Sequence, residues 1–142
     1  MAAIARKPRR KPVAPKSTAY KKGLAVRQKW LGKEYVKKAF READDFTIDL
    51  QHYVTEHAWG ASWARGVLPM KTRSIMNLAM ISALNRPHEL EIHVRAAMRN
   101  GITQAEIKEI FLQVAVYCGA PAALDSFRVA KRLYAEAAAK KK

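Results

Sequence analysis

Two tryptophans and three cations lie within one twenty-residue stretch of this sequence, from His57 to Met76. Trp59 and Trp63 are four residues apart, so they would share one face if this stretch is helical. Flat apolar walls beside fixed positive charge suit a dry pocket for a small anion, because charges act more strongly where water is excluded. The plainer alternative is a tight turn between helices, with the tryptophans in the core and the cations in solvent. The three cations are Arg65, Lys71 and Arg73.

One histidine is a candidate partner for these charges. His93 falls on the apolar side of a helix predicted over residues 87 to 99, three residues after Leu90 and four before Ala97. Without other evidence, the favoured interpretation is a buried histidine that is hydrogen-bonded for structure. As a functional group it would exchange protons near neutral pH, because the unperturbed pKa of imidazole is about 6.5. That role needs partners that converge on it from other helices.

The elements that would position these residues are all helices. Apolar residues recur at helical spacing throughout the chain after residue 18, and nothing in the pattern indicates a strand. Residues 71 to 85 are apolar on nearly all sides, as a central buried helix would be. Thr103 and Glu106 have the spacing of a capping box. The predicted helices cover about 20 to 40, 47 to 60, 71 to 85, 87 to 99, 104 to 118, and 121 to at least 134.

Length and charge set the domain organisation. The chain has 142 residues, of which 49% are apolar, and its net charge is +15. Residues 1–38 hold thirteen Lys or Arg and one acid, whereas residues 39–139 hold eleven of each sign. The excess charge is therefore in the tails. We predict a disordered basic arm over 1–18, one all-α domain of about six helices over 19–139, and a basic tail over 140–142.

Several classes of protein are disfavoured. No apolar run reaches the roughly 18 residues of a membrane span, and the first residues lack the apolar centre of a secretory signal. The single Cys118 excludes a disulfide framework. We therefore expect a cytoplasmic protein. Solubility or loose attraction of anions is the favoured role of the arm, and nucleic-acid binding is the minority interpretation, because no basic stripe continues onto a structured face.

Many residues between about Lys21 and Glu136 match one enzyme family in order and in spacing. They include Lys22-Gly-Leu-Ala-Val-Arg27, Ala58-Trp-Gly60, Trp63, Arg65, Arg73-Ser74, Glu89-Leu90, His93, Asn100-Gly-Ile-Thr103 and Tyr117-Cys-Gly-Ala-Pro-Ala-Ala123. In these residues the chain resembles the gamma-carboxymuconolactone decarboxylases. The resemblance implies an alkylhydroperoxidase-like helical fold, a homo-oligomer (hexamer or trimer), and a carboxy-lyase of the beta-ketoadipate pathway that uses no cofactor and no metal.

The chain departs from the family pattern at two places. Ala61 stands where the family usually has glutamate, and Gly66-Val67 replaces a Pro-Gly turn. Glu56, one helical turn before Gly60, is a candidate substitute for the lost acid. The broader superfamily includes redox proteins with a Cys-x-x-Cys-x-x-x-His motif, and alignment on His93 puts Arg86 and Glu89 at the two cysteine positions.

The implied reaction explains why such a site needs cations, aromatic walls and a histidine. In gamma-carboxymuconolactone the departing carboxylate sits on the ring carbon that is connected, through the ring double bond, to the lactone carbonyl. The electrons left by carbon dioxide flow into that carbonyl, so the substrate is its own electron sink. The protein must bind a dianion, stabilise charge on the lactone oxygen, and protonate the ring carbon alpha to that carbonyl, which gives beta-ketoadipate enol-lactone. The predicted catalytic residues are Arg73, on the lactone oxygen or the acetate side chain, and His93, as proton donor or polariser. The predicted substrate-binding residues are Trp59, Trp63, Arg65 and Glu56.

Two other classes stay open from the sequence. An alkylhydroperoxidase-like redox protein without the cysteine pair would depend on Cys118 alone, which lies beside Gly119 at a position more typical of packing. A nucleic-acid-binding protein would depend on the basic arm. Two experiments discriminate these classes from a decarboxylase. Peroxide consumption by Cys118→Ser tests the redox protein, and DNA retention by a chain that lacks residues 1–18 tests the nucleic-acid-binding protein.

Overall fold

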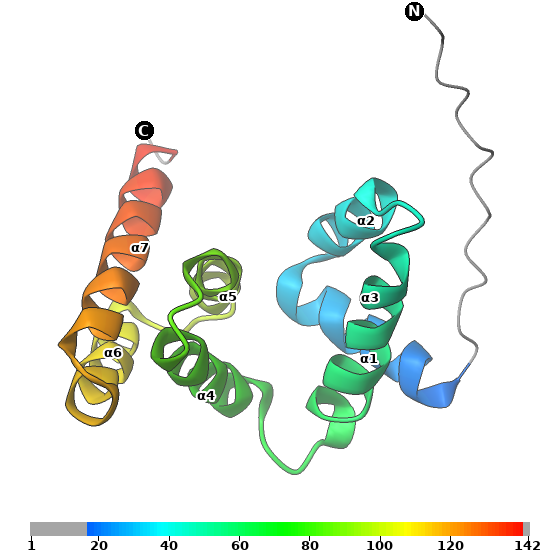
Figure 1. Cartoon of the computed structure of the whole chain (residues 1–142), viewed down its shortest axis with the longest axis horizontal. Coiled ribbons are helices and arrows are strands. Elements are labelled where there is room, and N and C mark those ends of the chain that lie inside the picture. The colour runs from blue at the N-terminus through cyan, green and yellow to red at the C-terminus, as the bar shows by residue number, and fades with distance from the viewer. Residues whose placement is uncertain (1–16, 141–142) are drawn as a thin grey trace, which may run out of the picture. The chain divides into compact units, whose positions relative to one another are not determined.

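The computed structural model describes residues 17–140, and every regular element among them is a helix (Figure 1). The all-α prediction is therefore confirmed for this part of the chain. Residues 1–16 of the predicted arm and residues 141–142 of the predicted tail lie outside it. The α-helices are α1 (Thr18–Leu31), α2 (Lys33–Glu42), α3 (Ile48–Tyr53), α4 (Met70–Ala83), α5 (Pro87–Arg99), α6 (Gln104–Cys118) and α7 (Ala120–Ala139). A π-helix, η1 (Val54–Gly60), and a short 3-10 helix, η2 (Trp63–Arg65), follow α3.

Two of the predicted helices differ in the structure. The single helix predicted over residues 20 to 40 is divided into α1 and α2 at Gly32, which has a φ of 94°. Only glycine adopts such a backbone readily, so the chain changes direction there. The helix predicted from residue 47 to 60 begins as α3 and continues as the π-helix η1. Hydrophobic periodicity identified the helical segments but not these changes within them.

The chain divides after Arg65 into two compact units. In the first unit, α1 packs against η1, α2 and η2. Its buried apolar residues are Tyr20, Trp30, Leu31, Val36, Trp59 and Trp63. In the second unit, α7 packs against α4, α5 and α6, and α4 packs against α5 and α6. The core of this unit is centred on Leu78, Leu90, Val94, Ile107, Phe111 and Leu133.

Two glycines allow α1 and η1 to approach each other closely. A Cβ atom on Gly23 would lie 2.0 Å from the carbonyl oxygen of Thr55, and one on Gly60 would lie 2.2 Å from the carbonyl oxygen of Ala19. Both distances are far shorter than a non-bonded contact, so no other residue fits without moving the backbone. The glycines of the Lys22-Gly and Trp59-Gly pairs therefore serve the packing of these two helices.

Ion pairs hold the helices of the second unit that carry Arg73 and His93. Lys71 Nζ lies 2.8 Å from Glu106 Oε1, which ties the start of α4 to the start of α6, and Glu106 also completes the predicted capping box with Thr103. The hydrogen bond from Lys71 is the main cause that lowers the pKa of Glu106 to about 2. Between α5 and α7, four ion pairs close a ring of Glu91, Arg95, Arg132 and Glu136. Such a network fixes a helix better than an isolated surface pair.

Candidate active site

The tryptophan pair predicted from the sequence forms part of an aromatic cluster in the first unit. Trp59 in η1 and Trp63 in η2 are both buried, with ring centroids 4.5 Å apart and ring planes inclined at 37°. Trp30, near the end of α1, adds a third ring, whose centroid lies 5.7 Å from that of Trp63. The place of Trp30 in this cluster was not predictable from local spacing, because its contact with Trp63 joins segments far apart along the chain.

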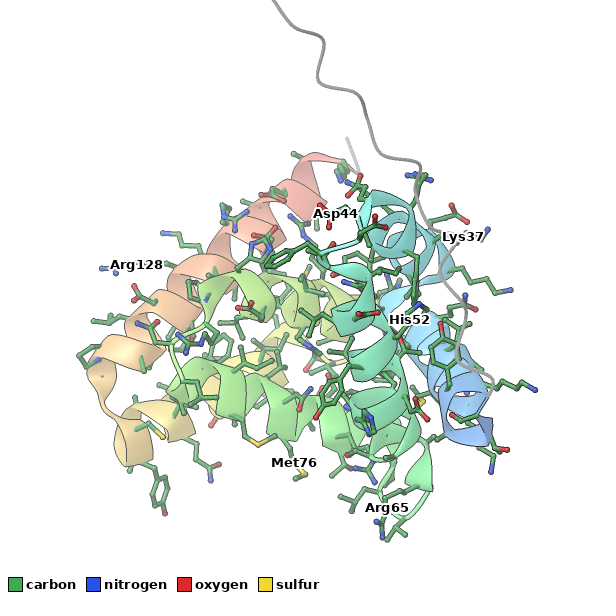
Figure 2. The ribbon with its side chains drawn as sticks, turned by 45° about the vertical axis from the view of Figure 1, so that its right-hand side comes forward. Lys37, Asp44, His52, Arg65, Met76 and Arg128 are labelled. Atoms are coloured by element: carbon green, nitrogen blue, oxygen red, sulfur yellow. The ribbon has the colours of Figure 1, made fainter. Side chains whose placement is uncertain are left out.

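The polar residues of this segment have different surroundings. Glu56 Oε1 accepts a hydrogen bond from Ser17 Oγ, the N-cap residue of α1. The carboxylate that was predicted to replace the missing family glutamate therefore has a partner within its own unit. Arg65 and Ala61 are exposed, and Figure 2 shows Arg65 at the end of this unit.

Arg73 and His93 lie on neighbouring helices of the second unit. Arg73 is half-buried in the first turn of α4, where its backbone N–H donates to the carbonyl oxygen of Pro69 at 3.1 Å. His93 lies in the middle of α5, which packs against α4. Lys71, the remaining cation of the opening stretch, is paired with Glu106. Arg73 is thus the half-buried cation of the three. The convergence of Arg73 and His93 with the tryptophan pair stays a prediction of the sequence.

The pKa of the His93 imidazole lies below the ordinary histidine value, on which its predicted role as proton donor, but not that as polariser, depends. Burial lowers the pKa of His93 from 6.5 to about 4, and the nearby charge of Glu89 only partly opposes this effect. Its Nδ1 atom is buried and has no hydrogen-bond partner among the described residues. The side chain is therefore neutral at pH 7, with one ring nitrogen able to donate and the other able to accept a hydrogen bond.

The described residues contain no group of three or more His, Cys, Asp or Glu side chains that could hold a metal ion. Among residues 17–140, none of the helices combines the length and the apolar character that a membrane crossing requires. Cys118, at the end of α6, is exposed, whereas the sequence suggested a packing position.

Comparisons with known proteins confirm the resemblance seen in the sequence. Residues 49–132 match the model of the carboxymuconolactone decarboxylase family. The chain is 38% identical over 115 residues to 4-carboxymuconolactone decarboxylase of Acinetobacter baylyi, which covers 81% of this chain and 86% of that protein. It is 41% identical over 113 residues to nitrosuccinic acid decarboxylase of Metarhizium robertsii, which covers 80% of this chain and 79% of that protein.

An uncharacterized 15.0 kDa protein of Paracoccus denitrificans is 33% identical over 81 residues, 55% of this chain and 60% of that protein. The chain belongs to the carboxymuconolactone decarboxylase family. The class of activity that the matches support is that of a carboxy-lyase.

Proposed function

We propose that this protein decarboxylates gamma-carboxymuconolactone to beta-ketoadipate enol-lactone, without a cofactor, in the degradation of aromatic compounds through protocatechuate. The observation that carries the proposal is the 38% identity to a 4-carboxymuconolactone decarboxylase over 86% of that protein's length. The aromatic cluster and the half-buried side chains of Arg73 and His93 are the groups that this reaction would use.

The neutral state of His93 favours one of its two predicted roles. A group with a pKa of about 4 is a poor reservoir of protons at pH 7, because only a very small fraction of it is protonated. A neutral imidazole still donates a hydrogen bond, and a preorganised donor stabilises negative charge that grows on an oxygen atom. We therefore assign His93 to polarising the lactone carbonyl.

Arg73 is assigned to the lactone oxygen or to the acetate side chain of the substrate. A cation bound tightly to the departing carboxylate would stabilise the ground state more than the transition state, and so would slow the loss of carbon dioxide. The same cation on the lactone oxygen acts on charge that appears only as the carbon–carbon bond breaks. Trp59 and Trp63 are assigned to removing water from the departing group.

Nitrosuccinate is the second candidate substrate, because the chain is 41% identical to a protein named for its decarboxylation. Nitrosuccinate and gamma-carboxymuconolactone are both small dianions at neutral pH. Each carries its own electron acceptor, a nitro group in one and a conjugated carbonyl in the other, so neither needs a cofactor as electron sink. The exposed Ala61, where the family usually has glutamate, is a departure that bears on the choice between them.

Parallel assays with the two acids test the proposal. The purified chain should release one carbon dioxide for each gamma-carboxymuconolactone consumed, with loss of the ultraviolet absorbance of the conjugated lactone. The same reaction without protein controls for spontaneous decarboxylation. Carbon dioxide release from nitrosuccinate alone would move the assignment to that acid, and release from neither would refute both.

We also propose that the chain assembles with copies of itself, as a hexamer or a trimer. The second unit has an apolar groove of about 400 Å³ between α4 and α6. Large apolar side chains that line it are exposed, among them Met80 at 50% and Tyr117 at 80%, and Met76 is visible in Figure 2. Contiguous exposed apolar surface of this kind is typical of an interface. Six of the groove residues are Ile75, Met76, Met80, Ile110, Val114 and Tyr117.

Sedimentation velocity at micromolar concentration should show one closed oligomer for the parent protein. Met80→Glu, in the groove, should shift the population towards smaller species, because a charge on an apolar interface must lose its water. Gln104→Glu adds the same charge at the exposed start of α6 and should leave the distribution unchanged. A stable monomer of the parent protein would contradict the proposed assembly.

A further inference from the structure

Arg27 is a buried cation that the predicted site does not use. Its side chain is 5% exposed, in α1. Nη1 donates to Thr55 Oγ1 and Nη2 to Gln51 Oε1, each at 2.8 Å, and the guanidinium carbon lies 5.6 Å from the centre of the Phe40 ring. No carboxylate pairs with it within residues 17–140. Burying a charge whose only hydrogen-bond partners are neutral costs free energy, so the buried position of Arg27 calls for an explanation.

The two partners of Arg27 flank the junction at which α3 becomes the π-helix η1. Thr55 is completely buried, and its hydroxyl also donates to the carbonyl oxygen of Gln51, at 2.7 Å. Hydrogen bonding changes register at this junction, and at the far end of η1 the N–H of Ala61 bonds to the carbonyl of Glu56, five residues back. The hydroxyl of Thr55 thus accepts from Arg27 and donates to Gln51, which fixes its direction. Arg27 therefore holds the point where the wider turn starts.

The register of η1 decides where the tryptophans point. An α-helix turns by about 100° for each residue, so adding or removing one residue from a turn rotates every later side chain by about that angle. π-helical turns are rare and are common at functional sites. Trp59 lies within η1 and Trp63 in η2 just after it, so their 4.5 Å contact depends on this register.

Other contacts between α1 and η1 do not fix the register in the same way. The glycine contacts of Gly23 and Gly60 set how closely the two helices approach. The hydrogen bond between Ser17 and Glu56 joins the exposed start of α1 to the first turn of η1. Only Arg27, among these contacts, makes directional bonds to residues on both sides of the junction, Gln51 in α3 and Thr55 in η1.

We propose that Arg27 is a positioning residue for the substrate site, which holds the π-helical register of η1 through Gln51 and Thr55 and thereby aims Trp59 at Trp63. The inference deepens the proposed function, since it gives Arg27 a catalytic consequence only if the two tryptophans line the site. The effect of Arg27 on the contact between the two tryptophans can be measured without substrate.

Two variants remove the interaction, and two matched variants control for them. Arg27→Met removes the guanidinium. Thr55→Val replaces the hydroxyl with a methyl group and keeps the shape of the side chain nearly constant. Thr55→Ser keeps the hydroxyl, and Arg41→Met makes the same exchange at an exposed position of α2. Far-ultraviolet circular dichroism reports helix content, near-ultraviolet circular dichroism reports the coupling between the stacked indoles, and steady-state kinetics use gamma-carboxymuconolactone.

Arg27→Met and Thr55→Val should keep their helix content but lose the near-ultraviolet signal of the indole pair, with kcat lowered by on the order of 10²-fold, as for a small misplacement of positioning groups. Thr55→Ser and Arg41→Met should match the parent protein in both. If Arg27→Met does not fold, Thr55→Val decides the question.

Variants that are less stable but keep the indole signal and kcat would show that Arg27 only supports the fold, and would overturn the proposal. If Arg27→Met and Thr55→Val lose the indole signal but the parent protein decarboxylates neither acid, the positioning role of Arg27 is supported and the proposed function is refuted instead.

Discussion

Arg73→Ala should lower kcat/KM for gamma-carboxymuconolactone by roughly 30-fold to 1,000-fold, which corresponds to about 2 to 4 kcal/mol of transition-state stabilisation. This is the range expected when one preorganised donor to a developing oxyanion is removed. The half-buried position of Arg73 in the first turn of α4 supports a large effect, because a partly dry guanidinium interacts more strongly than one in solvent. Steady-state kinetics with purified protein measure it.

The split between kcat and KM tells whether Arg73 acts in the chemical step. A loss in kcat with little change in KM indicates contact with the lactone oxygen, whereas a rise in KM alone indicates uniform binding of the acetate side chain. Arg86→Ala is the matched control, since Arg86 is the exposed N-cap residue of α5 and should affect neither parameter. Equal losses of kcat/KM in the two variants would mean that the loss comes from the change in net charge and not from a specific contact of Arg73.

The parts of the fold that were predictable depend on neighbours in sequence. The capping box of Thr103 and Glu106, the start of α5 at Pro87 and the end of α6 before Gly119 are all determined within a few residues, and the structure has them as predicted. The π-helix was not predictable in this way. Its register depends on Arg27, from a different helix, and hydrophobic periodicity does not report such a contact.

The candidate site shows the same limit. The spacing of Trp59 and Trp63 predicted a shared face only if the helix continued past Gly60. Their rings do meet, but across the turn between η1 and η2. Two contacts join distant segments of the chain, so no pattern of neighbouring residues predicted them. They are the hydrogen bond between Glu56 and Ser17 and the ring contact between Trp30 and Trp63. The helix that bears His93 was predictable, but the pKa of its imidazole depends on how completely the surrounding helices bury it.

His93→Gln should lower kcat more than it changes KM, because a polarising hydrogen bond matters most once charge has grown on the lactone oxygen. Glutamine is a conservative choice, since its amide also donates a hydrogen bond but does not titrate. An equal loss of affinity would show instead that His93 contributes to binding of the ground state.

The pH dependence of kcat/KM separates the two roles of His93, because this parameter reports the pKa values of the free enzyme. A neutral polariser with a pKa of about 4 should give a constant kcat/KM from pH 7 to about pH 5, with a fall near pH 4 that is absent in His93→Gln. A proton donor with the same pKa would give activity that rises about tenfold for each unit as the pH falls through that range.

Stability must be followed across the same pH range. The pKa of His93 is about 4 in the folded chain and 6.5 without burial, so the unfolded state takes up this proton first as the pH falls. His93 therefore destabilises the fold progressively below pH 6.5, and a fall in activity counts only where circular dichroism shows an intact fold. A rise in kcat/KM towards low pH in the parent protein, lost in His93→Gln, would contradict the polariser and identify His93 as the proton donor.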